Sequence, residues 1–183
     1  MIDKTGIVHY GKQLHKHGLV IGAGGNLSVR EKDRVLIKKK GADMSHGMPG
    51  SYVETDLSGL DPSANRLLSS EALLHAACYS LSDKINAVAH THSPYSIAAA
   101  DKFKELRNIS YEFECLTGGS VPVLEYIEPG SKELGDAVAE KISEGARAVL
   151  LKKHGPVAIG ADLKEAFLRV LAIERASISA LHG

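Results

Sequence analysis

The sequence predicts an α/β fold, in which helices cover the faces of one sheet. Helical and strand patterns are mixed along the chain and joined by short connections, which is typical of layered sheet-and-helix domains. The 183 residues are 44% hydrophobic and 24% charged, which suits one substantial core. No proline- or serine-rich linker, low-complexity block or internal repeat divides the chain. We therefore expect residues 1–183 to form a single domain, a three-layer α/β/α sandwich.

The first half of the chain predicts one helix and a group of strands around a glycine-rich turn. Residues 3–17 are expected to be helical, and Gly18 follows them as a C-terminal cap. The turn Gly22-Ala23-Gly24-Gly25 comes next. Strands are expected at 27–30, 34–38 and 52–57, with an irregular loop over 39–50.

The second half predicts further helices and strands. Each helix begins at a residue type that favours a helix N-terminus: Ser69 or Ser70, Pro94, Ser131 and Asp162. The expected helices run over 69–81, 94–104, 131–144 and 162–181, and the expected strands over 85–91, 109–114, 121–124 and 148–151.

Charge and cysteine content exclude several classes of protein. The 22 basic and 22 acidic residues balance, so no global field attracts nucleic acid. No apolar run is long enough to cross a bilayer, and the N-terminus lacks the apolar region of a signal peptide. Cys78 and Cys115 lack the Cys-x-x-Cys spacing, and both are expected to be small buried residues. We expect a cytoplasmic protein that binds neither nucleic acid nor membranes.

Two histidines at the end of an apolar strand are the main candidates for metal binding. In Ala89-His90-Thr91-His92, alternate side chains share one face of a strand, about 6.5–7 Å apart. Catalytic zinc commonly takes three protein ligands and leaves one position open. His154 is the best third donor, because it also follows an apolar strand and precedes a glycine that permits a sharp turn. The alternative is a pair of polar residues where a strand reaches the surface.

Glu71 is the candidate general base. It lies in the expected first turn of a helix, where a carboxylate is also favoured by the helix dipole alone. His75 is four residues later on the same helical face, so it can orient Glu71 or simply pack, and we favour the supporting role.

The glycine turn does not match a nucleotide-binding motif. Gly22 and Gly24 fit the start of G-x-G-x-x-G, but Leu27 occupies its last position and a strand follows. The turn can still bind an anion through backbone amides, with Asn26 as a further donor. A second phosphate candidate is Ser69-Ser70 at a helix N-terminus. A tight turn and an ordinary N-cap are the simpler alternatives.

The motifs together resemble the class II aldolase/adducin family, which includes L-fuculose-1-phosphate aldolase, L-ribulose-5-phosphate 4-epimerase and methylthioribulose-1-phosphate dehydratase. The resemblance spans roughly residues 5–180. Any one motif is weak, whereas the ordered set is specific. The matching segments are Gly24-Gly25-Asn26-Leu27-Ser28, Ser69-Ser70-Glu71 with His75, His90-Thr91-His92 and His154-Gly155.

The resemblance implies a central mixed, largely antiparallel sheet and a zinc-dependent aldolase. In this reading the enzyme reversibly cleaves a ketose 1-phosphate, such as L-fuculose 1-phosphate, to dihydroxyacetone phosphate and an aldehyde. It also implies a homotetramer with active sites at subunit interfaces, where Tyr111 matches a tyrosine that reaches the neighbouring site. The implied roles are zinc ligation by His90, His92 and His154, acid/base catalysis by Glu71, and phosphate binding by Gly25, Asn26, Gly41, Ser69 and Ser70. Three imidazoles also accept cobalt, manganese or nickel.

Two departures from the family pattern leave parts of this reading open. Lys38-Lys39-Lys40-Gly41 stands where family aldolases commonly read Thr-Pro-Thr-Gly, so a lysine there either contacts phosphate or is solvated. The given sequence ends at Gly183, and a tail that supplies a catalytic tyrosine in some members is expected to be absent. The group that exchanges a proton with the aldehyde is therefore unassigned.

Several other functions also remain open. A dehydratase, epimerase or decarboxylase would use much the same metal platform. A non-catalytic interaction module of the adducin type would need no metal. A purely structural zinc site would need a fourth protein ligand.

Overall fold

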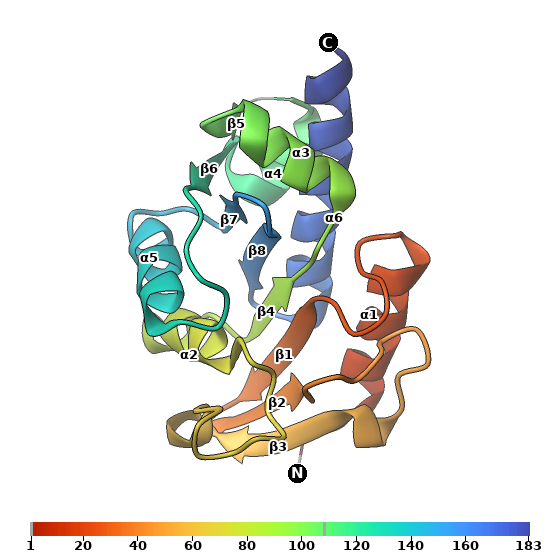
Figure 1. The fold of residues 1–183 in the computed structure, drawn as a ribbon, viewed down its shortest axis with the longest axis vertical. Helices are drawn as coiled ribbons and strands as arrows, with labels where there is room; N and C mark the ends of the chain where they lie inside the picture. Colours follow the sequence, from red (N-terminus) through yellow and green to blue (C-terminus); the bar gives the residue numbers. More distant parts are fainter. Residues whose placement is uncertain (1, 108) are drawn as a thin grey trace.

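The computed structural model describes residues 2–107 and 109–183, and one eight-stranded sheet forms its centre (Figure 1). The strands lie in the order β3-β2-β1-β4-β8-β7-β6-β5. Neighbouring strands are antiparallel, except that β6 and β7 run parallel. The sheet is thus mixed and largely antiparallel, as the resemblance implied. The strands are β1 Asn26–Glu31, β2 Arg34–Lys38, β3 Tyr52–Asp56, β4 Ala87–His90, β5 Glu105–Arg107, β6 Ser120–Leu124, β7 Ala148–Leu151 and β8 Gly155–Gly160.

Helices cover both faces of the sheet, which confirms the predicted three layers. In Figure 1, α2 and α5 lie together on one side, and α1 and α6 lie on the other. The apolar cluster under α1, α3, α4 and α6 is separate from the cluster under α2 and α5. The helices are α1 Thr5–Lys16, α2 Ala72–Ser80, α3 Pro94–Lys102, α4 Tyr111–Thr117, α5 Lys132–Ser143 and α6 Leu163–His182.

Strand alternation divides the core between the two faces. In β4, Ala87 and Ala89 face the α6 side while Val88 faces the α2 side, and all three are fully buried. Leu150 of β7 likewise faces the α6 side. Because β4 is central and buried on both faces, the polar residues that follow it are held by a rigid part of the sheet.

Several helices begin or end at the capping residues that the sequence predicted. Gly18 adopts a φ of +70° directly after the C-cap of α1. The side chains of Ser131 and Asp162 accept hydrogen bonds from backbone amides in the first turns of α5 and α6, at 3.1 and 2.7 Å. None of the helices formed by the described residues is both long and apolar enough to cross a membrane.

The strand expected at 109–114 is wrong, because residues 111–117 form α4. The alternation of Ile109, Tyr111 and Phe113 favours a strand, but local capping decides otherwise. The Ser110 hydroxyl accepts a hydrogen bond from the Phe113 amide at 3.1 Å, and Gly118 ends the helix with a φ of +81°. The strand that pairs with β6 is instead β5, which lies between the helix expected to end at 104 and the strand expected to begin at 109.

Three further differences concern the start of α2, the strand β8 and one cysteine. Helix α2 begins at Ala72, with Glu71 at its N-cap, so neither Ser69 nor Ser70 caps it as expected. Strand β8 was not predicted, because Gly155 was interpreted only as a turn residue. Cys78 is buried as expected, whereas Cys115 is exposed on α4, so the prediction for Cys115 was wrong.

Candidate metal and catalytic site

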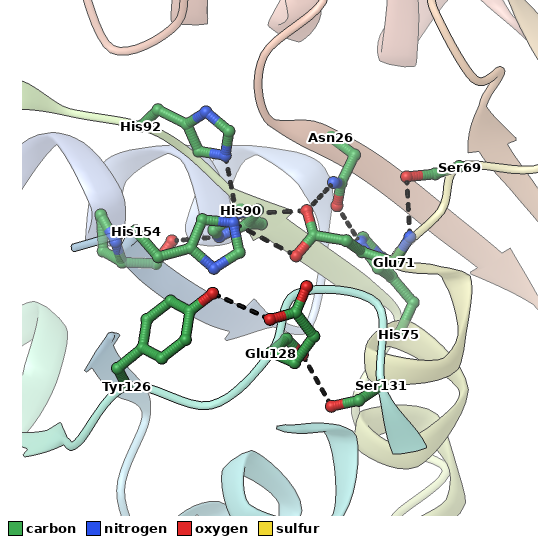
Figure 2. Close-up of polar contacts among 11 residues, drawn as sticks. Asn26, Ser69, Glu71, His75, His90, His92, Tyr126, Glu128, Ser131 and His154 are labelled. Atoms are coloured by element: carbon green, nitrogen blue, oxygen red, sulfur yellow. Dashed lines mark hydrogen bonds and ion pairs between the residues drawn. The ribbon is translucent and has the colours of Figure 1, made fainter. Parts of the chain in front are cut away.

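Three histidine rings converge at the edge of the sheet where β4 and β7 end. Nε2 of His90 lies 3.1 Å from Nε2 of His92 and 3.1 Å from Nε2 of His154. His90 is fully buried, and the other two rings are half-buried at the open side of the site. Figure 2 shows the three rings grouped around one point, with Glu71 facing them from the start of α2. The other five histidines of the chain, apart from His75, are exposed: His9, His15, His17, His46 and His182.

The β7–β8 hairpin brings His154 to His90, the last residue of β4, and to His92, which follows the strand. Strand β8 lies between β4 and β7, so the tight turn from β7 into β8 places its residues beside the end of β4. Lys153 precedes His154 with a φ of +59°, and Gly155 follows with a φ of +130°. A Cβ on Gly155 would collide with the carbonyl oxygen of Thr91, so only glycine fits this close approach.

A hydrogen bond fixes the orientation of the His90 ring. Its Nδ1 lies 3.0 Å from the carbonyl oxygen of Pro156, which can only accept, so Nδ1 carries the proton and donates it. Nε2 of the neutral ring is then an unprotonated lone-pair donor aimed at the centre of the cluster. This arrangement is typical of histidines that bind metals.

Burial keeps these imidazoles neutral. It lowers the pKa of His90 to about 3 and that of His154 to about 4, with repulsion from a neighbouring imidazole as the second cause. Burial also lowers the pKa of His92. Metal ions bind the unprotonated imidazole, so the rings are in the required state at neutral pH.

Glu71 completes the cluster from the opposite side. Its Oε2 lies 3.3 Å from Nε2 of His90, and its Oε1 lies 3.4 Å from Nε2 of His154. The carboxylate is buried, with 6% of the residue exposed. Among the described residues, Glu71 Oε1 and His154 Nδ1 are the buried side-chain atoms without a hydrogen-bond partner. Glu71 thus lies where it can act as a base or as a fourth metal ligand.

The four donors fit a divalent transition metal. Their ligand atoms all lie within 4.8 Å of one another. A tetrahedral zinc ion with bonds of about 2.0–2.1 Å holds its ligand atoms about 3.3 Å apart, close to the 3.1 Å between the ring nitrogens. The partnerless Oε1 of Glu71 supports the same reading, because a buried anionic oxygen needs a proton or a cation nearby.

His75 supports Glu71 through Asn26 rather than directly. The Asn26 side-chain amide donates to Glu71 Oε2 at 2.8 Å, and His75 Nε2 donates to Asn26 Oδ1. On the other side of the ring, the Ser28 hydroxyl donates to His75 Nδ1 at 2.6 Å and accepts from the Tyr79 hydroxyl at 2.6 Å. Burial lowers the pKa of His75 to about 3, so the ring is neutral and can both donate and accept.

The candidate phosphate residues lie in three segments: the glycine turn, the residues just before α2, and the loop that contains Gly41. A Cβ on Gly25 would lie 2.7 Å from the His90 carbonyl oxygen, so the glycine turn packs directly against β4. Ser69 is buried, and its hydroxyl accepts from the Glu71 amide at 3.3 Å, while Ser70 is exposed. Gly41 has a φ of +74° in an exposed loop. The Asn26 side chain is engaged with Glu71 and His75, so phosphate binding by Asn26 stays a prediction.

Lys38 neither projects into solvent nor forms part of an exposed basic run. Its Nζ donates to the carbonyl oxygens of Ala23 and Ala42, at 2.5 and 2.9 Å, and only 2% of the residue is exposed. It therefore connects the glycine turn to the loop that contains Gly41. Burial lowers the pKa of Lys38 to about 8. Lys40 is exposed and Lys39 half-buried.

Two residues beside the site were not predicted from the sequence. Figure 2 shows Tyr126 and Glu128 facing the His154 and Glu71 side of the cluster. Both come from the connection between β6 and α5. The available signal was the pair of apolar strands at 121–124 and 148–151, because parallel neighbours deliver the residues that follow them to the same sheet edge.

Comparisons with known proteins agree with this geometry. A family model described as "Class II Aldolase and Adducin N-terminal domain" matches residues 5–180. The chain is 36% identical over 174 residues to 5-deoxy-D-ribulose 1-phosphate aldolase of Bacillus thuringiensis serovar kurstaki, a match that covers 94% of this chain and 81% of that protein. It is 30% identical over 176 residues to L-fuculose phosphate aldolase of Methanococcus maripaludis, with 94% and 93% covered. The crystal structure of L-fuculose-1-phosphate aldolase from Thermus thermophilus matches with a TM-score of 0.88 at 27% identity, over 97% of this chain and 91% of that one.

Proposed function

The chain belongs to the class II aldolase and adducin family, and from this premise we propose that it is a zinc-dependent sugar-phosphate aldolase. The reaction is the reversible cleavage of a ketose 1-phosphate between C3 and C4 to dihydroxyacetone phosphate and an aldehyde. The observation that carries the proposal is the convergence of three neutral imidazoles and one buried carboxylate on a single point.

His90, His92 and His154 would hold the metal, and zinc is the ion that best suits three imidazoles with one open position. When bound, the ion supplies a Lewis acid beside the negative charge that develops as the carbon–carbon bond breaks.

Glu71 is the proposed acid/base at C3. After cleavage it returns a proton to the C3 carbon of the enediolate, and in the condensation direction it removes that proton. The hydrogen bond from Asn26 holds one carboxylate oxygen, and the other has no hydrogen-bond partner among the described residues, so it is available to the substrate. The chain of hydrogen bonds through His75 fixes Asn26 and thereby aims the carboxylate.

The substrate phosphate would bind between the glycine turn and the start of α2. Gly25 and Asn26 belong to the turn, Ser69 and Ser70 precede α2, and Gly41 lies in a loop joined to the turn by Lys38. Backbone amides at such positions bind phosphate oxygens without a charged side chain. The buried Lys38 ammonium contributes positive charge on this side of the site.

Two named relatives guide the choice of substrate. Their names specify 5-deoxy-D-ribulose 1-phosphate and L-fuculose phosphate, whose 1-phosphates would both give dihydroxyacetone phosphate and a short uncharged aldehyde. The test is a panel of phosphorylated ketoses that includes these two sugars as 1-phosphates, L-ribulose 5-phosphate and methylthioribulose 1-phosphate. Release of dihydroxyacetone phosphate identifies aldol cleavage, whereas loss of water or a changed C4 configuration identifies a dehydratase or an epimerase.

A purely structural zinc site is the remaining rival on the same residues, since Glu71 is available as a fourth ligand. That reading requires zinc affinity to fall when Glu71 is changed, and it predicts no turnover of any sugar phosphate. An adducin-type interaction module would likewise show no turnover.

We also infer a homotetramer in the cytoplasm. The exposed apolar side chains Tyr111 and Ile178, beside a cavity of about 320 Å³ between α4 and α6, support a subunit contact on this face. The two free cysteines are compatible with a reducing compartment. Light scattering coupled to size-exclusion chromatography tests the assembly, and a monomer at micromolar concentration would contradict it.

A further inference from the structure

The connection between β6 and α5, Glu125–Gly130, runs along the open side of the metal cluster. At its start, the Lys152 amide donates to the Leu124 carbonyl at 3.1 Å, and Lys152 Nζ pairs with Glu125 at 2.7 Å. Lys152 is two residues before His154. At its end, Gly130 has a φ of +79°, and a Cβ there would lie 2.9 Å from the Ser70 carbonyl oxygen. The segment therefore passes from the neighbourhood of His154 to the residue next to Glu71.

Two side chains of this segment form a hydrogen-bonded pair. The Tyr126 hydroxyl donates to Glu128 Oε2 at 3.0 Å, and Lys153 Nζ lies 5.9 Å from the centre of the Tyr126 ring. Tyr126 is 51% exposed, so its hydroxyl is accessible to a bound molecule. In Figure 2 the ring lies beside His154 and Glu128 lies on the Glu71 side, with the hydrogen bond between them.

We propose that Tyr126 and Glu128 form the proton relay for the aldehyde half of the substrate. This inference rests on the proposed aldolase function, in which Glu71 acts at C3 while the hydroxyl on C4 must lose its proton as it becomes a carbonyl. Tyr126 is the catalytic residue that touches the C4 hydroxyl, and Glu128 is the positioning residue that receives the phenol proton.

The relay balances in both directions. In cleavage, the C3–C4 bond breaks, its electron pair stays on the C3 fragment, and the C4 oxygen forms the carbonyl. The proton of the C4 hydroxyl passes to the Tyr126 oxygen as the phenol proton passes to Glu128, which releases it to solvent. In condensation the same steps run backwards, and Tyr126 protonates the aldehyde oxygen as the new bond forms. No other reactant is needed.

The state of the pair suits this role. The hydrogen bond to Glu128 raises the pKa of Tyr126, so the phenol keeps its proton at neutral pH and has one to pass on. Both residues are exposed, so Glu128 can exchange its proton with water between turnovers.

The two halves of the reaction can be measured separately, which gives the test. Exchange of the C3 hydrogen of dihydroxyacetone phosphate with D2O, followed by NMR without aldehyde, needs Glu71 and the metal but not the relay. Cleavage of the ketose 1-phosphate that the wild-type enzyme turns over needs both. The variants are Tyr126→Phe and Glu128→Gln, with Tyr10→Phe on α1 as the matched control and Tyr111→Phe as the rival.

We expect Tyr126→Phe to cleave at least about 100-fold more slowly while exchange stays within about twofold of wild type. Glu128→Gln should also slow cleavage without slowing exchange, but by a smaller factor. Tyr10→Phe should change neither rate. Unchanged cleavage in Tyr126→Phe, equal loss of both rates, or the split appearing in Tyr111→Phe instead would overturn the relay. A wild-type enzyme that neither cleaves nor exchanges would overturn the proposed function and the relay together, a result distinct from failure of the relay alone.

Discussion

The Asn26 side-chain amide lies 2.8 Å from Oε2 of Glu71 and donates a hydrogen bond to it. The two residues are 45 positions apart, one at the start of β1 and the other at the N-cap of α2. Because His75 holds the other end of the Asn26 amide, the carboxylate is oriented by groups that do not themselves point at the metal cluster. In the proposed function, this arrangement separates three ring nitrogens, which hold the metal, from one aimed carboxylate, which transfers the proton.

Glu71→Gln is the first test of that separation. The amide keeps the shape of the side chain but cannot accept a proton, so we expect turnover to fall by about 10²–10⁴-fold. Zinc content should stay near one ion per chain, because three imidazoles remain. Steady-state kinetics and metal analysis on one preparation measure both. Loss of zinc in step with activity would favour Glu71 as a structural ligand.

Acid stability depends on the buried histidines. The pKa of His75 is lowered to about 3 in the fold and is about 6.5 in the unfolded chain. Between these values only the unfolded state binds the proton, so stability is present above pH 6.5 and is lost as the pH falls toward 3. In metal-free protein we expect His75→Gln to reduce the slope of unfolding free energy against pH by about 1.4 kcal/mol per unit in this range. Urea unfolding from about pH 7 to 4 measures the slopes, and identical slopes would contradict a neutral buried His75.

Burial of Lys38 makes the free energy of unfolding depend on pH in the alkaline range. Its pKa is lowered to about 8 in the fold from its ordinary value of 10.5, so between these values the unfolded state holds one more proton. Stability from this residue therefore increases as the pH rises from 8 to 10.5. Lys38→Met should lack that increase, which amounts to up to about 1.4 kcal/mol per pH unit. Unfolding free energies of the wild type and Lys38→Met, measured at intervals from about pH 7 to 10, test this expectation. Parallel curves for the two proteins would show that Lys38 is solvated.

The glycine turn offers a matched pair of substitutions. Gly22 and Gly25 both have positive φ, +54° and +64°, but a Cβ at position 22 meets nothing within 4 Å, whereas at position 25 it lies 2.7 Å from the His90 carbonyl oxygen. Gly22→Ala should lower the free energy of unfolding only by the cost of placing a residue with a Cβ in the left-handed conformation, about 1–2 kcal/mol. Gly25→Ala should lose about 1–3 kcal/mol more and should also weaken zinc binding, because β4 must shift. Chemical denaturation and zinc titration compare them, and equal losses would show that the turn does not press on β4.

Sequence patterns predicted the parts of the fold that depend on local signals. Ser131 and Asp162 cap helices where they were expected to, and the family resemblance is confirmed by the match over residues 5–180. The strand predicted at 109–114 was wrong because an alternating apolar pattern and a Ser110 cap compete within the same short segment. Periodicity alone does not decide such a conflict, whereas the cap at Ser110 and the left-handed Gly118 at the other end do.

Contacts between distant segments were the least predictable part of the site. His75 was expected to support Glu71, but its route through Asn26 depends on β1 pairing with β4 beside α2. Lys38 was considered a phosphate contact or a solvated residue, but the facing carbonyl oxygens of Ala23 and Ala42 bury it. Tyr126 and Glu128 carried no motif, because their place follows from the parallel pairing of β6 with β7.

Anomalous diffraction at the zinc absorption edge tests most directly whether three imidazoles hold one ion. For crystals of the zinc-loaded protein we predict one strong peak per chain, about 2.0–2.1 Å from Nε2 of His90, His92 and His154. Crystals of the His154→Ala variant, grown at the same zinc concentration, should show a much weaker peak at that position. A map without density among these rings, or a peak undiminished in His154→Ala, would contradict the account.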